Sequence, residues 1–105
     1  MTWSYNYKSA SQYLYKDLRL YENPDLVAQN DEICWAVSFW FWKDRVHYRS
    51  GVSEGQFGVT TRAINGGLEC GNGPNVQTAK KRFEIYKRVL LAFNINESPI
   101  ETGCY

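Results

Sequence analysis

The sequence has little net charge and no long apolar run, and both features limit the classes of partner that the protein can bind. Twelve Lys and Arg residues nearly balance eleven Asp and Glu residues among 105, which gives a net charge of +1. A duplex-DNA-binding surface normally needs a clear basic excess, so we expect no nucleic-acid partner. No apolar stretch approaches the roughly 20 residues that span a bilayer, so we expect no membrane partner either.

Targeting, cofactor and metal signals are equally scarce. Residues 1–7 lack a basic segment followed by an apolar one, so no signal peptide is expected there. The glycine-rich residues 65–74 lack both the Lys-Ser/Thr ending of a phosphate loop and the preceding strand of a dinucleotide fingerprint. The only histidine, His47, lies in a polar stretch, where a solvated side chain is the simpler interpretation. We therefore expect no cofactor and no metal ion.

Aromatic residues, by contrast, are abundant and make up 16% of the chain. Such a content fits a heavily packed core, which is the default, or a surface that stacks on flat ligands such as sugar rings. Residues 32–42 carry apolar side chains at the spacing of one helical face, with aromatic residues on much of the other side. A helix that is apolar all round is normally buried. This segment is therefore predicted to be a buried aromatic helix capped by Asn30, over the alternative of a buried strand.

The remaining periodic segments are helical as well. A short helix is predicted to run to Arg19, with Ser9 or Ser11 as its cap. Residues 57–64 show a weaker helical pattern. Asn75 is predicted to cap a long helix to about Phe93, which combines a clear apolar stripe with a basic face. These patterns predict an all-α protein with about four to five helices around the aromatic helix.

Three short motifs occur together in a specific order along the chain. They are Trp3-Ser4-Tyr5-Asn6-Tyr7, then Ile33 to Trp42, then Phe57 to Cys70 with its Ile-Asn-Gly-Gly-Leu-Glu-Cys ending. Together they resemble the family 19 chitinases, plant-type glycoside hydrolases with a lysozyme-like α-helical fold. The resemblance covers essentially the whole chain but only the C-terminal half of the family's catalytic domain. It implies a single domain over residues 1–105, a truncated lobe of that fold.

The resemblance also implies a set of substrate-binding residues, namely Thr2, Tyr5, Asn6, Asn65, Glu69 and Arg82. Thr2 matches a hydroxyl position that helps to hold the attacking water, and Tyr5 and Asn6 match positions that contact the N-acetylglucosamine chain. Asn65 matches the family's cleft asparagine. Glu69 and Arg82 match a charged pair tied to the catalytic glutamate. Structural alternatives stay open: Asn65 could end a helix in the left-handed conformation, and Glu69 and Arg82 could form an ordinary ion pair.

The chain has three cysteines, which suit one disulfide and one spare thiol. The resemblance implies that Cys70 and Cys104 pair and tie the C-terminal tail to the glycine-rich turn. Cys34 then remains free, and we expect it to be buried as a small apolar side chain. Because of this pair and the family, we expect an extracellular, secreted protein, although the chain shows no signal peptide.

The family's general acid and base are glutamates of the other half of the domain, and no residue of this chain matches them. We therefore expect no catalytic residue here. The prediction is a chitinase-like protein that recognises chitin or N-acetylglucosamine oligosaccharides and is silent alone. There are two alternatives. The chain could belong to an active inverting endochitinase that the N-terminal half completes, or it could be a structural or interaction module. The aromatic excess predicts an apolar face covered by a second copy or a partner chain.

Overall fold

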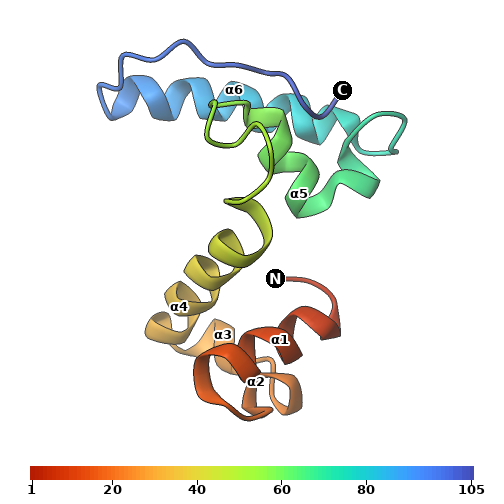
Figure 1. Cartoon of the computed structure of the whole chain (residues 1–105), viewed down its shortest axis with the longest axis vertical. Coiled ribbons are helices and arrows are strands. Elements are labelled where there is room, and N and C mark those ends of the chain that lie inside the picture. The colour runs from red at the N-terminus through yellow and green to blue at the C-terminus, as the bar shows by residue number, and fades with distance from the viewer. The chain divides into compact units, whose positions relative to one another are not determined.

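The computed structural model of the protein describes all 105 residues, and every regular element in it is a helix. The elements are α1 (Ser4–Tyr15), α2 (Arg19–Glu22), α3 (Leu26–Gln29), α4 (Asp31–Phe41), a π-helical segment (Trp42–Val46), α5 (Phe57–Glu69) and α6 (Val76–Ala92), labelled in Figure 1. The only β pairing is an isolated bridge between Gln56 and Ile100. The all-α prediction is confirmed. Besides the aromatic helix α4 there are five α-helices, within the predicted four to five, and two of them, α2 and α3, are single turns of four residues.

The chain divides into two compact units, Met1–Asp44 and Arg45–Tyr105. The first unit holds all four tryptophans of the chain, and the second holds none. That residues 1–105 behave as a single domain stays a prediction.

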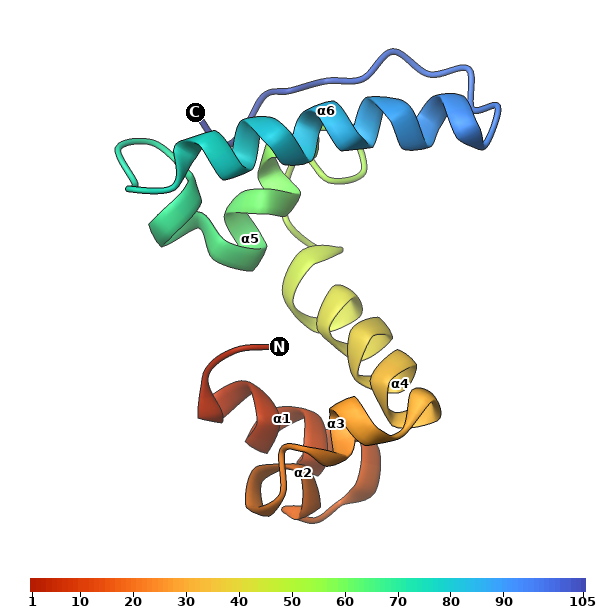
Figure 2. The same ribbon diagram turned by 180° about the vertical axis from the view of Figure 1, so that it is seen from behind.

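In the first unit, α1 packs against α2 and α4, and α3 packs against α4 (Figures 1 and 2). Its core consists of Ala10, Leu20, Val37 and Trp40. A buried hydroxyl joins two of the helices, because the Ser11 Oγ of α1 accepts a hydrogen bond of 3.0 Å from the backbone N–H of Leu20 in α2. Apolar packing and satisfied buried polar groups such as this hydroxyl thus hold this unit together.

The first helix both begins and ends earlier than predicted. Lys16 follows α1 in the left-handed conformation, with φ 60°, and this stops the helix. The Asp17 carboxylate then accepts a hydrogen bond of 3.0 Å from the backbone N–H of Arg19, which starts α2. The single helix running to Arg19 with a cap at Ser9 or Ser11 was therefore wrong, because both serines lie inside α1.

The aromatic helix α4 forms where it was predicted, but it is buried on one side only. Val37 and Trp40 are buried, whereas Trp35 and Phe39 expose 65% and 70% of their surface. The prediction of a helix buried all round was wrong, because α4 has packing partners in its unit on one side alone. Cys34 is exposed as well, so the prediction of a buried thiol was also wrong.

The two asparagines that precede long helices act differently. The Asn30 side-chain oxygen accepts a hydrogen bond of 3.1 Å from the backbone N–H of Ile33, as predicted for a cap of α4. Asn75 precedes α6 without a side-chain cap, and only its backbone carbonyl accepts, from the N–H of Thr78 at 2.9 Å. The second helix start was therefore predicted correctly in position but not in its chemistry.

In the second unit, α5 packs against α6, and the chain after Ala92 runs back along α6 (Figures 1 and 2). Phe57 of α5 stacks on Tyr86 of α6 with ring centroids 4.4 Å apart, and Phe83 lies 5.9 Å from the same ring of Phe57. At the other end of α5, Ala79 packs with the two paired cysteines in a small buried cluster. Stacked aromatic rings at one end and this small buried cluster at the other therefore hold the two helices together.

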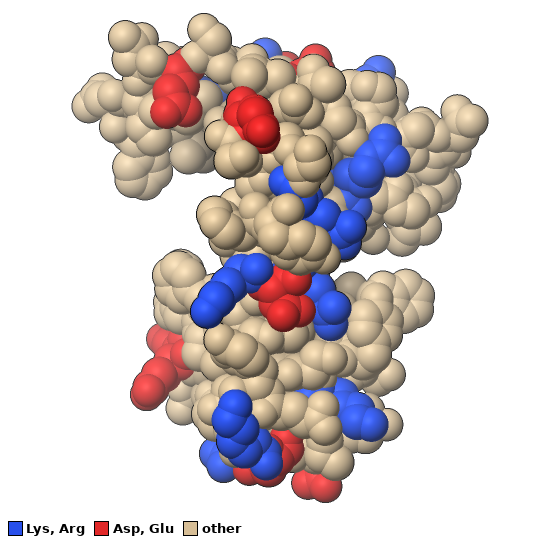
Figure 3. All heavy atoms as spheres, viewed as in Figure 1, with Lys and Arg blue, Asp and Glu red and all other residues tan.

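Surface charge is mixed in sign. Figure 3 shows Lys and Arg interspersed with Asp and Glu among wide uncharged areas on the face that it presents. None of the helices combines the length and the apolar content that crossing a membrane requires. No three His, Cys, Asp or Glu side chains gather as the ligands of a metal ion would.

Candidate functional site

The centre of the first candidate site is a bend in α5 at Asn65. This residue has φ −150° and ψ 36°, while the helix continues beyond it to Glu69. Asn65 therefore does not adopt the left-handed conformation, so that alternative interpretation was wrong, and it lies at a kink between two helical stretches. The bend allows the Asn65 side chain to reach forward, and its Nδ2 donates a hydrogen bond of 2.9 Å to Oε1 of Glu69.

Glu69 is held by a second helix as well. The guanidinium of Arg82 on α6 donates from Nε to Oε2 at 2.6 Å and from Nη2 to Oε1 at 2.9 Å. This two-pronged geometry is the strong form of an Arg–carboxylate pair. The Glu69 side chain is only 3% exposed, whereas that of Arg82 is 49% exposed. The charged pair implied by the resemblance is thus formed, with the carboxylate inside and the cation at the surface.

The electrostatics of this network favour the ionised carboxylate. The hydrogen bond from Arg82 is the largest influence and lowers the pKa of Glu69, burial opposes it, and the bond from Asn65 lowers the pKa further. The same carboxylate raises the pKa of Arg82. Glu69 is therefore an anion that accepts hydrogen bonds and has no proton to give near neutral pH.

The C-terminal tail is tied to the end of α5 beside this network. Cys70 and Cys104 form a disulfide, which confirms the predicted pair. Arg62, one helical turn before Asn65, donates from Nε to the carbonyl of Gly103 at 2.6 Å and from Nη2 to the carbonyl of Cys104 at 3.0 Å. Sequence reasoning missed Arg62. The available signal was the only cation of this helix, which lies on the same face as Asn65 and Glu69.

The second group of predicted residues lies at the start of the first unit. Thr2 and Tyr5 are exposed, but Asn6 is only 5% exposed, and its Nδ2 donates to the carbonyl of Thr2 at 2.8 Å. Between them Trp3 has φ 67°, a conformation that an aromatic residue rarely adopts. Asn6 therefore supports the strained turn from within, whereas the side chains of Thr2 and Tyr5 face solvent.

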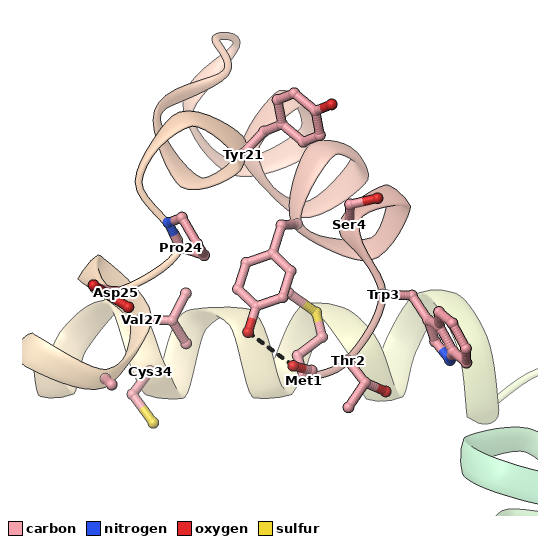
Figure 4. A pocket seen from close by; sticks show the side chains of 11 residues that line it. Met1, Thr2, Trp3, Ser4, Tyr21, Pro24, Asp25, Val27 and Cys34 are labelled. Carbon is pink, nitrogen blue, oxygen red and sulfur yellow. Dashed lines mark hydrogen bonds between the residues drawn. The ribbon is translucent and has the colours of Figure 1, made fainter.

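A hollow of about 620 Å³ opens beside this turn, between the start of α1, the α2–α3 connection and α4. Figure 4 shows Thr2, Trp3 and Cys34 around it, with a tyrosine hydroxyl donating to the carbonyl of Met1. That tyrosine is Tyr7, and the hydrogen bond measures 2.8 Å. Sequence reasoning missed Tyr7, which holds the same strained turn as Asn6. The six predicted substrate-binding residues thus form two groups, one in each unit.

Comparisons with known proteins identify the relatives of this chain. Acidic endochitinase SP2 of Beta vulgaris is 39% identical over 95 residues, which are 90% of this chain and 31% of that protein. Chitinase 5 of Oryza sativa subsp. japonica is 39% identical over 97 residues, or 91% of this chain and 31% of its own length. Endochitinase B of Zea mays is 34% identical over 99 residues, or 94% and 33%. No family model matches the chain, and no solved structure does.

The helical fold and these matches define a chitinase-like protein. Within that class, the chain is similar to one part of plant endochitinases. It spans about a third of the length of the curated relatives that it matches.

Proposed function

We propose that this chain is a family 19 chitinase-like module that recognises chitin or N-acetylglucosamine oligosaccharides and does not cleave them by itself. The observation that carries the proposal is the Asn65–Glu69–Arg82 network, which occurs within a sequence that matches endochitinases over nine-tenths of its length. The network holds an amide at a fixed position beside a buried anion.

Asn65 has the chemistry that an N-acetyl group requires. A primary amide carries two donor hydrogens and one acceptor oxygen, and Glu69 uses one of the donors. The remaining N–H and the carbonyl suit the carbonyl and N–H of an acetamido group. In the first unit, the ring of Tyr5 is 60% exposed and is suited to packing on the face of a sugar. These two side chains are the proposed polar and aromatic contacts.

The carboxylates of this chain argue against catalysis by it alone. Inverting hydrolysis needs a protonated acid and a separate base, with carboxyl groups roughly 6.5–9.5 Å apart. Glu69 is the only buried carboxylate, and its lowered pKa keeps it ionised, which is wrong for a general acid. Since the chain spans about a third of its relatives, a catalytic pair supplied by further sequence is the alternative within the same class.

Binding is tested first, by calorimetric titration of the chain with N-acetylglucosamine tetramers and hexamers. We expect saturable binding that Asn65→Ala abolishes. Asn72→Ala is the matched control, because Asn72 is an exposed asparagine of the same glycine-rich turn and belongs to no part of the network. An equal loss in both variants, or no binding by the wild-type chain, would contradict the proposal.

The absence of hydrolytic activity is tested by incubating the purified chain with a chitin hexamer and separating the products. We expect no cleavage above the buffer blank. Cleavage by the wild-type chain that disappears in Glu69→Gln would instead make Glu69 a catalytic residue and favour the active-enzyme alternative.

An interaction module is the second candidate function, and one specific observation favours it. Trp35, Phe39 and Trp42 are 65%, 70% and 44% exposed and follow each other at helical spacing. Exposed apolar surface of this kind marks partner sites. Sedimentation velocity tests it, with self-association that Trp35→Ser and Phe39→Ser together abolish as the supporting result, and a monomer over the accessible concentration range as the contrary one.

We also propose an extracellular location. A disulfide in a small domain persists in oxidising compartments, and Cys70–Cys104 supports this assignment. Fusion of a reporter to the natural gene product, followed by fractionation of the producing cells and their medium, tests it directly.

A further inference from the structure

The end of the chain is fastened to α5 over almost the whole length of that helix. At its start, the backbone N–H of Phe57 donates to the carbonyl of Ile100 at 2.9 Å. At its end, the disulfide joins Cys70 to Cys104, and the N–H of Gly71 donates to the carbonyl of Cys104 at 2.8 Å. The bend at Asn65 lies between these two ties.

Between these two ties, the C-terminal tail and the first turn of α5 lie too close together to leave room for side chains. A Cβ on Gly58 would lie 2.6 Å from the backbone nitrogen of Cys104, and a Cβ on Gly103 would lie 2.6 Å from that of Val59. Gly103 also has φ 118°, which favours glycine. The tail and the first turns of α5 therefore meet backbone to backbone, which leaves little freedom for either to shift.

Arg62 links this contact to the bend itself. Its guanidinium reaches the two carbonyls of Gly103 and Cys104, while its Cγ lies 3.0 Å from where a Cβ of Gly66 would be. Gly66 directly follows Asn65. The side chain thus covers the bend with its stem and holds the tail with its head group.

We propose that the segment Ile100–Cys104 is a brace that sets the bend of α5, and that Arg62 is a positioning residue for Asn65 and Glu69. Ligand recognition at Asn65 then depends on a segment about 35 residues away in sequence that touches no ligand itself. The consequence for sugar rests on the proposed function, but the brace does not.

The test compares the 105-residue wild-type chain with Arg62→Met, which removes both hydrogen bonds of the guanidinium but keeps an apolar stem. Arg49→Met is the matched control, because Arg49 donates from Nε to the carbonyl of Arg45 at 3.2 Å without touching the tail. Arg62→Lys is the conservative variant. It can donate to one carbonyl but cannot form the planar fork.

Two readouts report on the site without any ligand, namely the side-chain amide resonances of Asn65 and the titration of the Glu69 carboxyl, both followed by NMR. In Arg62→Met we expect the amide to lose its distinct shift and the measured pKa of Glu69 to rise toward that of a free glutamate. In Arg62→Lys we expect both readouts to lie between those of the wild type and Arg62→Met. In Arg49→Met we expect them to match the wild type. A lowered melting temperature with both readouts unchanged would reduce Arg62 to a structural role and overturn the proposal.

The third readout is the affinity for N-acetylglucosamine hexamer. We expect Arg62→Met to bind about tenfold more weakly, the equivalent of losing one well-placed hydrogen bond. If the wild-type chain binds no sugar, the proposed function fails, and the NMR readouts still decide whether the brace exists. Unchanged affinity in Arg62→Met, in a chain that does bind, would count against the positioning role.

Discussion

The glycine-rich end of α5 and the aromatic helix α4 both stand out in the sequence, yet they are fixed by different kinds of contact. Asn65, Glu69 and the last residues of α5 are held by directional ties to α6 and to the C-terminal tail. α4 carries far more apolar surface, but only Val37 and Trp40 are buried. A few hydrogen bonds and one disulfide therefore fix the position of a helix end better than many aromatic side chains that have no defined packing partner.

The largest expected effect separates the two sides of α4. Trp40→Ala should destabilise the protein by about 3–5 kcal/mol, because it empties a core position that is 4% exposed. Trp35→Ala, on the exposed side of the same helix, should change stability by less than about 0.5 kcal/mol. Urea denaturation followed by circular dichroism measures both. Similar costs for the two tryptophans would mean that the exposed side of α4 is covered in solution.

The next effect concerns the covalent tie of the second unit. Replacing Cys70 and Cys104 together by serine should cost about 3–4 kcal/mol in the chain-entropy account of a disulfide that spans 34 positions. Cys34→Ser is the control, and it should cost little because that thiol is exposed and unpaired. The same urea titration applies. A double variant as stable as the control would show that the hydrogen bonds of the tail suffice without the disulfide.

A smaller effect is expected for the ion pair. Arg82→Met leaves the carboxylate of Glu69 buried without its main partner and should cost about 2 kcal/mol, below the cost for fully buried pairs because Arg82 is half exposed. Lys87→Met is the control. It breaks an exposed pair with Glu84 at 2.7 Å and should cost less than about 0.5 kcal/mol. Equal costs would remove the distinction between the buried network and an ordinary surface pair.

The smallest effect is in the pH dependence of stability. Folding lowers the pKa of Glu69 below its ordinary value of 4.5, so the folded state binds this proton less tightly than the unfolded chain. The stabilisation is fully present above pH 4.5 and is lost as the pH falls toward the folded pKa. Urea midpoints measured between about pH 3 and pH 6 should fall more steeply on the acid side in the wild type than in Arg82→Met. If the urea midpoints of the two proteins depended on pH in the same way, the lowered pKa of Glu69 and its cause in Arg82 would be contradicted.

The sequence predicted what depends on local pattern or on a specific motif. The helical periodicity located α4 and α6, and the resemblance to chitinases predicted the Cys70–Cys104 pair and the contact of Glu69 with Arg82. Asn30 fulfilled its role as a cap because capping involves only neighbouring residues.

What the sequence did not predict depends on tertiary partners. Periodicity identifies which residues of α4 share a face, but not how many of its faces meet another helix, so Cys34 and Phe39 were wrongly expected to be buried. The bend at Asn65 was missed because glycines after an asparagine usually mark a helix end, whereas here the tail holds the following turn in place. Arg62 was missed because its partners are carbonyls some forty residues away.

The uneven distribution of tryptophan gives the two units separate optical signals. Because all four indoles lie within Met1–Asp44, intrinsic fluorescence excited near the red edge of tyrosine absorption reports on that unit alone. Far-ultraviolet dichroism reports on the helices of both. If the chain unfolds as a single cooperative domain, the two signals coincide along a denaturant titration. If the units melt independently, the fluorescence transition separates from the remaining loss of helix, and the stability of Arg45–Tyr105 can be measured in the intact chain without any label.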